Sequence, residues 1–324
     1  MNLELIDYSY EDKDFEIFIS NSQNGTFMST KRFLSYHGDK FKNIFLGVTS
    51  KNEIVSTLVG TTIFEDQKKI FYSHPGASFG GIILNYLDYS SSLEVFNLYK
   101  NWLNKNNYNS LIYKDLPRDN LINNSESLNY IFNLNKIKIL KSELSTFIDL
   151  TNQYEFIYSN FNNLTKRIIK KNKSLFETRI SNNKKDLNSF YNILIDNLKT
   201  RHSAFATHTL NDLSYLFNEF DQIKLFITSD NTNNQMASGI IVFELNNQIA
   251  LAFYIATNQK FLNYSPVRST ISTAIEFYQK QGFKSFNFGI STENSGKQVN
   301  EGLIKFKEGF GGFNVIRNTL ELTL

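Results

Sequence analysis

The chain has 324 residues, of which 41% are hydrophobic and 20% charged, so it is long enough for two domains with packed cores. It has no cysteine, which excludes disulfides, thiolate metal sites and cysteine nucleophiles, and its four histidines do not suggest a multi-histidine metal site. The formal net charge of +3 does not demand a nucleic-acid partner.

The sequence shows no signal for export and no segment for membrane insertion. The stretch from Met1 to Asp14 is acidic and polar, unlike a signal peptide. The longest apolar run, Ile249–Ala256, is far shorter than the roughly 20 residues that cross a bilayer. We therefore expect a cytoplasmic protein without an integral membrane segment.

In chain order, the first clear pattern is three strands, a helix and a fourth strand. The strands are β-branched and aromatic runs at Asn43–Val48, Ile54–Phe64 and Ile70–Ser73, separated by polar turns. Helical spacing of apolar residues follows over Ser92–Lys105, and the next strand is expected at Ser110–Tyr113.

The segment from Leu140 to Phe220 has mostly helical spacing. Helices are expected over Tyr154–Lys173 and Asp186–Arg201, and Thr209 is placed to cap a third.

The first pattern then returns, about 180 residues after its first occurrence. The predicted elements are strands at Lys224–Thr228, Ala237–Phe243 and Ile249–Ala256, a helix over Arg268–Gln281 and a strand at Phe283–Gly289. This repeat predicts two related α/β domains with mixed sheets, 1–145 and 146–324, the second opening with the helical segment.

Four segments carry residues that suit chemistry. The glycine-rich Ser73–Gly81 follows a strand, so its N–H groups could receive an anion or simply form a turn. In Lys166–Lys173 five of eight residues are basic, which suits phosphates or a solvated helix face. Arg201 and His202 lie at the end of a predicted helix. Arg201 could bind a phosphate and His202 could transfer a proton, or both could simply interact favourably with the dipole of the helix.

The fourth segment is the C-terminal block. A strand at Asn287–Gly289 leads into a polar loop containing Ser291 and Glu293, then a short helix with Lys307 and a glycine cluster. Ligands in open α/β sheets lie where strand ends open into loops, and Lys307 could face a developing oxyanion. The alternative is a surface helix that packs through Phe306 and its apolar neighbours.

These segments together resemble a known group. The duplicated unit resembles the GNAT acyltransferase fold, and the full order resembles the FemAB-like branch, in which two such units are joined around a central cleft. The segments that carry the resemblance are Thr30–Gly38, Ser73–Gly76 with Phe79–Gly81, Tyr113–Lys114 with Pro117, Arg201–His202, and Phe288–Ser291 leading to Gly302–Leu303, Phe306–Lys307 and Phe310–Gly312.

The resemblance implies an acceptor site on the first domain and an acyl donor site on the second. It implies catalytic positions at His202, Glu293 and Lys307, with His202 or Glu293 as the base and Lys307 at the oxyanion. The implied substrate-binding residues are His74, Gly76, Phe79, Gly80, Gly81, Tyr113, Lys114, Arg201, Tyr254, Ser291 and Phe306.

The expected function is acyl or aminoacyl transfer to an amine of a nucleotide-linked sugar or cell-envelope precursor, as in polysaccharide biosynthesis. Direct attack with both substrates bound is favoured, because the chain has no cysteine and no evident Ser-His-Asp motif. Aminoacyl-tRNA and acyl-CoA both stay open as co-substrate. Asn263–Thr270 lacks the glycines of the pyrophosphate-binding loop typical of coenzyme A users, and the long helical hairpin that binds tRNA in some relatives has no counterpart in the sequence. No metal and no tightly bound cofactor is expected. The alternative function is a non-catalytic binder of nucleic acid or anionic glycan through Lys166–Lys173.

Overall fold

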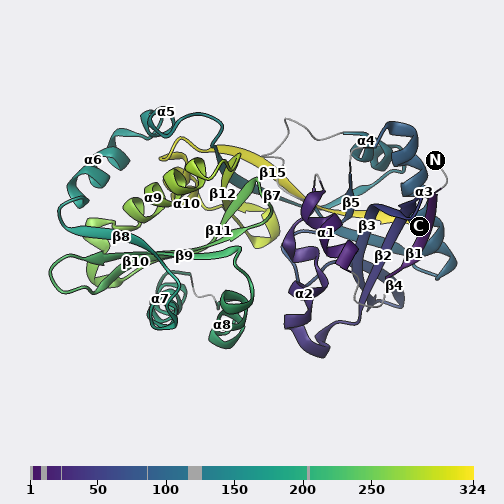
Figure 1. Ribbon diagram of the computed structural model, residues 1–324, viewed down its shortest axis with the longest axis horizontal. Helices are drawn as coiled ribbons and strands as arrows, with labels where there is room; N and C mark the ends of the chain where they lie inside the picture. Colours follow the sequence, from purple (N-terminus) through teal and green to yellow (C-terminus); the bar gives the residue numbers. More distant parts are fainter. Residues whose placement is uncertain (1–2, 9–12, 23, 86, 116–125, 203–204) are drawn as a thin grey trace. The chain divides into compact units, whose positions relative to one another are not determined.

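A computed structural model describes residues 3–8, 13–22, 24–85, 87–115, 126–202 and 205–324, without the side chains of Arg201 and His202 (Figure 1). Pro117, one of the positions that carry the family resemblance, lies outside these residues. The chain forms two compact units. The first comprises Met1–Leu144, Thr292–Gln298 and Ile316–Leu324, and the second Ser145–Ser291 and Val299–Val315.

The first unit contains a mixed sheet. Its antiparallel strands, in spatial order, are β1 (Leu3–Asp7), β2 (Asn43–Ser50), β3 (Glu53–Glu65) and β4 (Lys68–Ser73), with β5 (Ile82–Leu84) also paired to β3. The strand β6 (Ser110–Lys114) lies parallel to β4, and β15 (Phe313–Thr323) pairs antiparallel with β6 through Thr319–Thr323. The helices are α1 (Lys13–Asn21), α2 (Lys31–Leu34), α3 (Tyr89–Lys105) and α4 (Ser127–Leu134).

The second unit repeats this order. Its antiparallel strands are β8 (Phe176–Ser181), β9 (Ile223–Asp230), β10 (Met236–Glu244) and β11 (Ile249–Thr257). The strand β12 (Ser285–Ile290) lies parallel to β11, and β7 (Lys138–Asp149) pairs antiparallel with β12 through Ser145–Asp149. The helices are α5 (Tyr154–Ser159), α6 (Asn163–Asn172), α7 (Lys184–Asn197), α8 (Leu210–Glu219), α9 (Val267–Lys280) and α10 (Glu301–Glu308).

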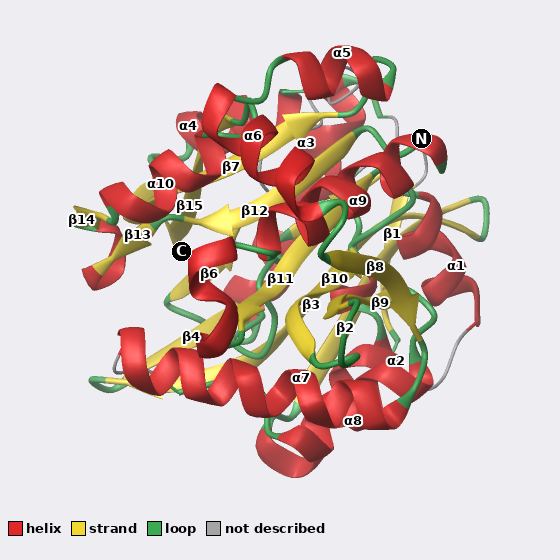
Figure 2. Cartoon of the chain, turned by 90° about the vertical axis from the view of Figure 1, so that its left-hand side faces the viewer, coloured by secondary structure: helices red, strands yellow, loops and turns green. Residues whose placement is uncertain are grey.

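Helices cover both faces of the second sheet (Figure 2). On one face, Ile240 and Val242 of β10 share a core with Ile271 and Ile275 of α9. On the other, a Cβ atom at Gly239 would lie 2.6 Å from the ring of Phe190 on α7, so only glycine lets α7 approach this closely.

The predicted strands and helices of both repeats are present, and Thr209 caps α8 in a capping box with Asp212. The prediction of a mostly helical stretch from Leu140 to Phe220 was wrong at two places. Most of β7 lies at the beginning of this stretch, and the whole of β8 lies inside it. The single helix expected over Tyr154–Lys173 is also divided, because Asn162 caps a new helix by accepting the Thr165 N–H at 2.8 Å.

The residues of the second unit differ from the expected 146–324. Residues 316–324 belong to the first unit, because the end of β15 pairs with β6, and residues 292–298 also belong to it. Since that pairing joins residues about 200 positions apart, no local sequence signal marks it.

Candidate active site

The parallel strands β11 and β12 part in the middle of the second sheet. Their pairing ends at Leu251 and Asn287, although β11 continues to Thr257 and β12 to Ile290. Two irregularities lie just beyond this point. Phe253 has no partner across β10, which is a β-bulge, and Gly289 adopts a φ of +69° where β12 loses register with β7. The strand ends therefore open into a gap that other elements line.

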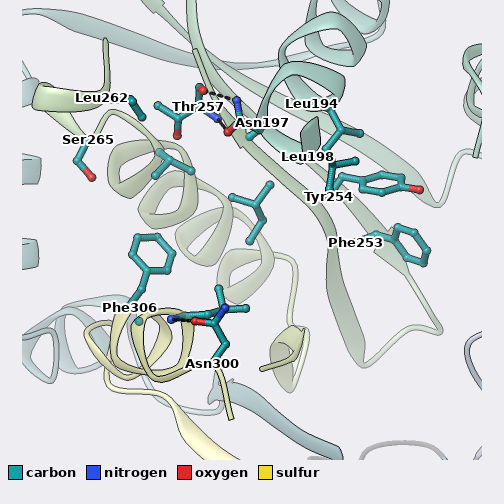
Figure 3. Close-up of a pocket in the computed structure, with 15 residues that line it drawn as sticks. Leu194, Asn197, Leu198, Phe253, Tyr254, Thr257, Leu262, Ser265, Asn300 and Phe306 are labelled. Atoms are coloured by element: carbon teal, nitrogen blue, oxygen red, sulfur yellow. Dashed lines mark hydrogen bonds between the residues drawn. The ribbon is translucent and has the colours of Figure 1, made fainter. Parts of the chain in front are cut away.

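A cavity of about 560 Å³ lies beside the end of β11 that has parted from β12 (Figure 3). Its walls come from β11, the end of α7, the start of α9 and α10. The lining residues are Leu194, Asn197, Leu198, Phe253, Tyr254, Ile255, Ala256, Thr257, Leu262, Ser265, Val267, Asn300, Gly302, Leu303 and Phe306. A largely apolar cavity with a few polar groups beside the carboxyl ends of parallel strands is a typical small-molecule site.

Phe306 lines the cavity and is held by a buried cation. The guanidinium of Arg268 lies 4.8 Å from the Phe306 ring centroid and donates to the hydroxyl of Thr165 at 2.5 Å. Arg268 is only 9% exposed, and among the described residues no carboxylate pairs with it. Sequence reasoning missed Arg268, because one arginine in a helix with polar neighbours gives no signal of burial.

Lys307 is 1% exposed, and its ammonium group donates to the carbonyls of Gly289 at 2.9 Å and Ile290 at 2.7 Å. Burial lowers the pKa of Lys307 to about 7. The side chain therefore fastens α10 to the end of β12. Its role at an oxyanion stays a prediction, since Lys307 is not among the residues that line the cavity.

Two other predicted residues lie in or next to the cavity. Tyr254 lines it, and its hydroxyl lies 2.9 Å from Nδ1 of the buried His208 and accepts the His208 N–H. Ser291 is buried, and its carbonyl accepts the N–H of Asn300, a lining residue, at 2.8 Å.

The two predicted bases are not brought to the cavity by any described contact. Glu293 is exposed and belongs to the residues of the first unit. Arg201 and His202 lie in a π-helical turn, Leu198–His202, and their side chains are outside the described part of the chain. Leu198, at the start of this turn, lines the cavity.

The remaining predicted residues gather in the first unit around the loop between β4 and β5. The N–H groups of its glycines are used within the unit: Gly76 donates to Nδ1 of His74, Gly80 to the Lys114 carbonyl and Gly81 to the Ser73 hydroxyl. These three donors are thus engaged, and the loop is a packed turn in this structure.

Packing explains the rest of this cluster. A side chain at Gly81 would meet the Tyr113 ring at 2.8 Å. The ammonium of Lys114 donates to the Ala77 carbonyl at 2.9 Å, and burial lowers the Lys114 pKa to about 8 with the help of the Arg317 charge. Phe79 is buried beneath the guanidinium of Arg317, 4.6 Å from its ring.

Within the described ranges, no three His, Asp or Glu side chains are grouped so that they could hold a metal ion. Over the same residues, no helix combines the length and the apolar composition that a bilayer span requires.

No protein family model matches the sequence, and no curated protein matches it. Solved structures do. FemX has a TM-score of 0.74 at 9% identity, covering 99% of this chain and 97% of that chain. L-PGS from Bacillus licheniformis has a TM-score of 0.60 at 11% identity, covering 97% and 91%. A tandem GNAT protein from the clavulanic acid biosynthesis pathway has a TM-score of 0.50 at 10% identity, covering 99% and 98%.

At these identities the similarity concerns the fold. The chain has a mixed α/β fold of the tandem GNAT type. Its structural neighbours include FemX, so the resemblance to the FemAB-like arrangement is confirmed at the level of the fold.

Proposed function

We propose that this protein is an acyltransferase that binds the acyl donor in the second unit, in the cavity beside the end of β11 that has parted from β12. The observation that carries the proposal is the coincidence of three features at one point. The strands part, the Phe253 bulge interrupts the β11 ladder, and a cavity of about 560 Å³ opens there. A carbonyl group placed in the cavity would lie next to irregular backbone, whose N–H groups suit an oxyanion.

The proposed reaction is direct transfer. The nitrogen of an acceptor amine attacks the carbonyl carbon of the donor, and the C–O or C–S bond to the donor's leaving group then breaks. The leaving oxygen or sulfur takes the bonding electron pair and a proton, and the amine loses one proton to a base. The acceptor amine belongs to a nucleotide-linked sugar or cell-envelope precursor, and His202 or Glu293 serves as the base.

The structure at the start of α9 helps to choose between acyl-CoA and aminoacyl-tRNA as the donor. Coenzyme A users hold the pyrophosphate on free N–H groups at this helix terminus. Here the N–H groups of Arg268, Ser269 and Thr270 already donate to the carbonyls of Ser265 or Pro266. Three N–H groups that could hold a pyrophosphate are therefore already engaged, and we place an aminoacyl ester, as in aminoacyl-tRNA, before acyl-CoA.

The test uses the position of Gly302, which lines the cavity and whose Cβ would meet only the Asn300 side chain, at 3.6 Å. The Gly302→Phe variant adds a ring at the cavity wall, and Gly302→Ala is the matched control. Wild type and both variants are incubated with alanyl-tRNA or acetyl-CoA and with UDP-linked amino sugars or UDP-linked muropeptides, and products are identified by mass spectrometry.

We expect product from wild type and Gly302→Ala and at least a tenfold loss with Gly302→Phe. Equal product from all three would place the donor elsewhere. Isothermal titration with acetyl-CoA decides between donors, since measurable heat would reverse their order.

A further inference from the structure

The outer face of α6 is a continuous basic surface. Its five cations are Lys166, Arg167, Lys170, Lys171 and Lys173, where Lys173 is the C-terminal cap. The buried positions Thr165, Ile169 and Asn172 point to the core, so the cations occupy the opposite half of the helix. No acidic residue occurs between Glu155 and Glu177.

This charge is not neutralised inside the unit. Among the described residues, no carboxylate pairs with any of the five cations. Lys166 donates to the Ser159 carbonyl at 2.6 Å, and the Lys171 ammonium lies 5.7 Å from the Tyr264 ring. An isolated basic face of this kind is attracted to a polyanionic surface.

Exposed apolar side chains accompany the cations. Leu164 is 46% exposed, and it shares one stripe of the helix with Arg167 and Lys171 because these positions are three and seven residues apart. Phe156 on the preceding helix α5 is 56% exposed. The phosphodiester backbone of a nucleic acid has no apolar region that an aliphatic side chain could contact. A lipid surface can accept such a side chain between its headgroups.

We propose that the α6 face docks the protein onto an anionic phospholipid surface. The cations engage lipid phosphates, and Leu164 enters the boundary between headgroups and acyl chains. The outward face of the helix is exposed at Arg167, Lys170 and Lys171, so it can meet a flat surface directly. Nucleic-acid strands, by contrast, are held in grooves with aromatic platforms.

The buried side of α6, opposite the basic face, contacts a segment that lines the cavity. The Asn172 amide donates to the Tyr264 carbonyl at 3.0 Å, and the next residue, Ser265, lines the cavity. This inference does not depend on the proposed transferase activity.

The test compares binding to vesicles of pure phosphatidylcholine with binding to vesicles that also contain phosphatidylglycerol. The variant carries Arg167→Gln, Lys170→Gln and Lys171→Gln together. A matched control removes three exposed lysines elsewhere in the second unit through Lys184→Gln, Lys185→Gln and Lys284→Gln. All these residues are exposed, and thermal unfolding checks that each variant is folded.

We expect wild type and control to sediment with the anionic vesicles only. The α6 variant should bind on the order of 100-fold more weakly, since each basic residue near an anionic leaflet contributes about 1 kcal/mol. Leu164→Asn should weaken vesicle binding, whereas Ile195→Asn on α7, also an exposed aliphatic position, should not.

Three results would overturn the proposal. The α6 variant and the control could bind anionic vesicles equally, or wild type could fail to bind them. Single-stranded RNA could also be bound through α6 more tightly than the vesicles, which would make this face a nucleic-acid surface.

Discussion

The side-chain amide of Asn197 pairs with the backbone of Thr257 as a neighbouring β-strand would. Its Nδ2 atom donates to the Thr257 carbonyl at 2.7 Å, and its Oδ1 atom accepts the Thr257 N–H at 3.1 Å. Nδ2 also donates to the Ile193 carbonyl at 2.9 Å. One buried amide thus joins the last turn of α7 to the end of β11, where both line the cavity (Figure 3).

Replacing Asn197 by Asp should destabilise the second unit. A carboxylate oxygen would replace the donor that faces the carbonyls of Thr257 and Ile193, so that the buried Thr257 carbonyl loses its side-chain donor and faces a negative charge. We expect a loss of about 2–4 kcal/mol in the free energy of unfolding, measured by urea denaturation. Asn197→Ser, which keeps a small donor, should lose less. A urea midpoint equal to that of wild type would show that the pairing contributes nothing.

Lys307 should make stability depend on alkaline pH. Its pKa is about 7 in the folded chain and near 10.5 in the unfolded chain, so between these values the unfolded chain binds more protons. The free energy of unfolding then rises with pH, by at most about 1.4 kcal/mol per pH unit from this group. Lys307→Met lacks this rise and also leaves the Gly289 and Ile290 carbonyls without their donor.

The measurement is the difference in unfolding free energy between wild type and Lys307→Met at pH 7 and pH 9.5. Other titrating groups cancel in this difference. The unfolding free energy of wild type, relative to that of the variant, should increase as pH rises. A difference that is constant with pH would mean that Lys307 stays charged in the folded chain.

His74 should remain neutral well below its usual titration range. Its Nδ1 accepts the Gly76 N–H at 3.0 Å, so in the neutral ring the proton lies on Nε2, which is 2.8 Å from Oδ1 of Asn43. Burial, with the charges of His37 and Lys114, lowers the pKa of His74 to about 3. Since the unfolded chain takes up a proton near pH 6.5, this group's contribution to stability falls as pH falls from about 6.5 to 3.

Long-range proton–nitrogen NMR at pH 5 can observe this state directly. The spectrum should contain the signal of a neutral imidazole in the Nε2–H form that is absent from His74→Gln. If every histidine were doubly protonated at pH 5, the assignment would be wrong.

Arg268 stacks on aromatic rings, and within the described part of the chain no carboxylate pairs with it, so we expect that its charge does not stabilise the fold. Arg268→Met keeps most of the contact with Phe306 and Phe310 and removes a buried charge. We expect a change within about 1 kcal/mol, or a gain, whereas Arg268→Ala should lose about 2–3 kcal/mol through lost packing. Thermal unfolding of the two variants checks this. Equal large losses in both would show that the guanidinium itself stabilises the fold.

The sequence predicted the repeated elements well because each is a local pattern. The β11 run and the spacing of Ile271 and Ile275 in α9 are visible without any tertiary information. The cavity was not predictable in the same way. It depends on where β11 and β12 part and on the bulge at Phe253, and neither has a composition of its own.

The sequence also did not predict which charged residues are buried. In α10, Lys305 and Lys307 look alike in the sequence, yet Lys305 pairs with Glu301 at the surface and Lys307 is 1% exposed. The glycine loop illustrates the reverse. Its N–H groups suited an anion, but the neighbouring Ser73 hydroxyl and Lys114 carbonyl accept from Gly81 and Gly80 instead.

The exchange of strands at the end of the chain has a consequence for synthesis. The first unit needs residues 316–324 to pair with β6, and these are made after all the residues of the second unit. The second unit takes part of β7, which is made before the rest of it. The sheet edge beside β6 therefore stays open until the second unit has been made, and residues 1–144 alone do not form the whole first unit.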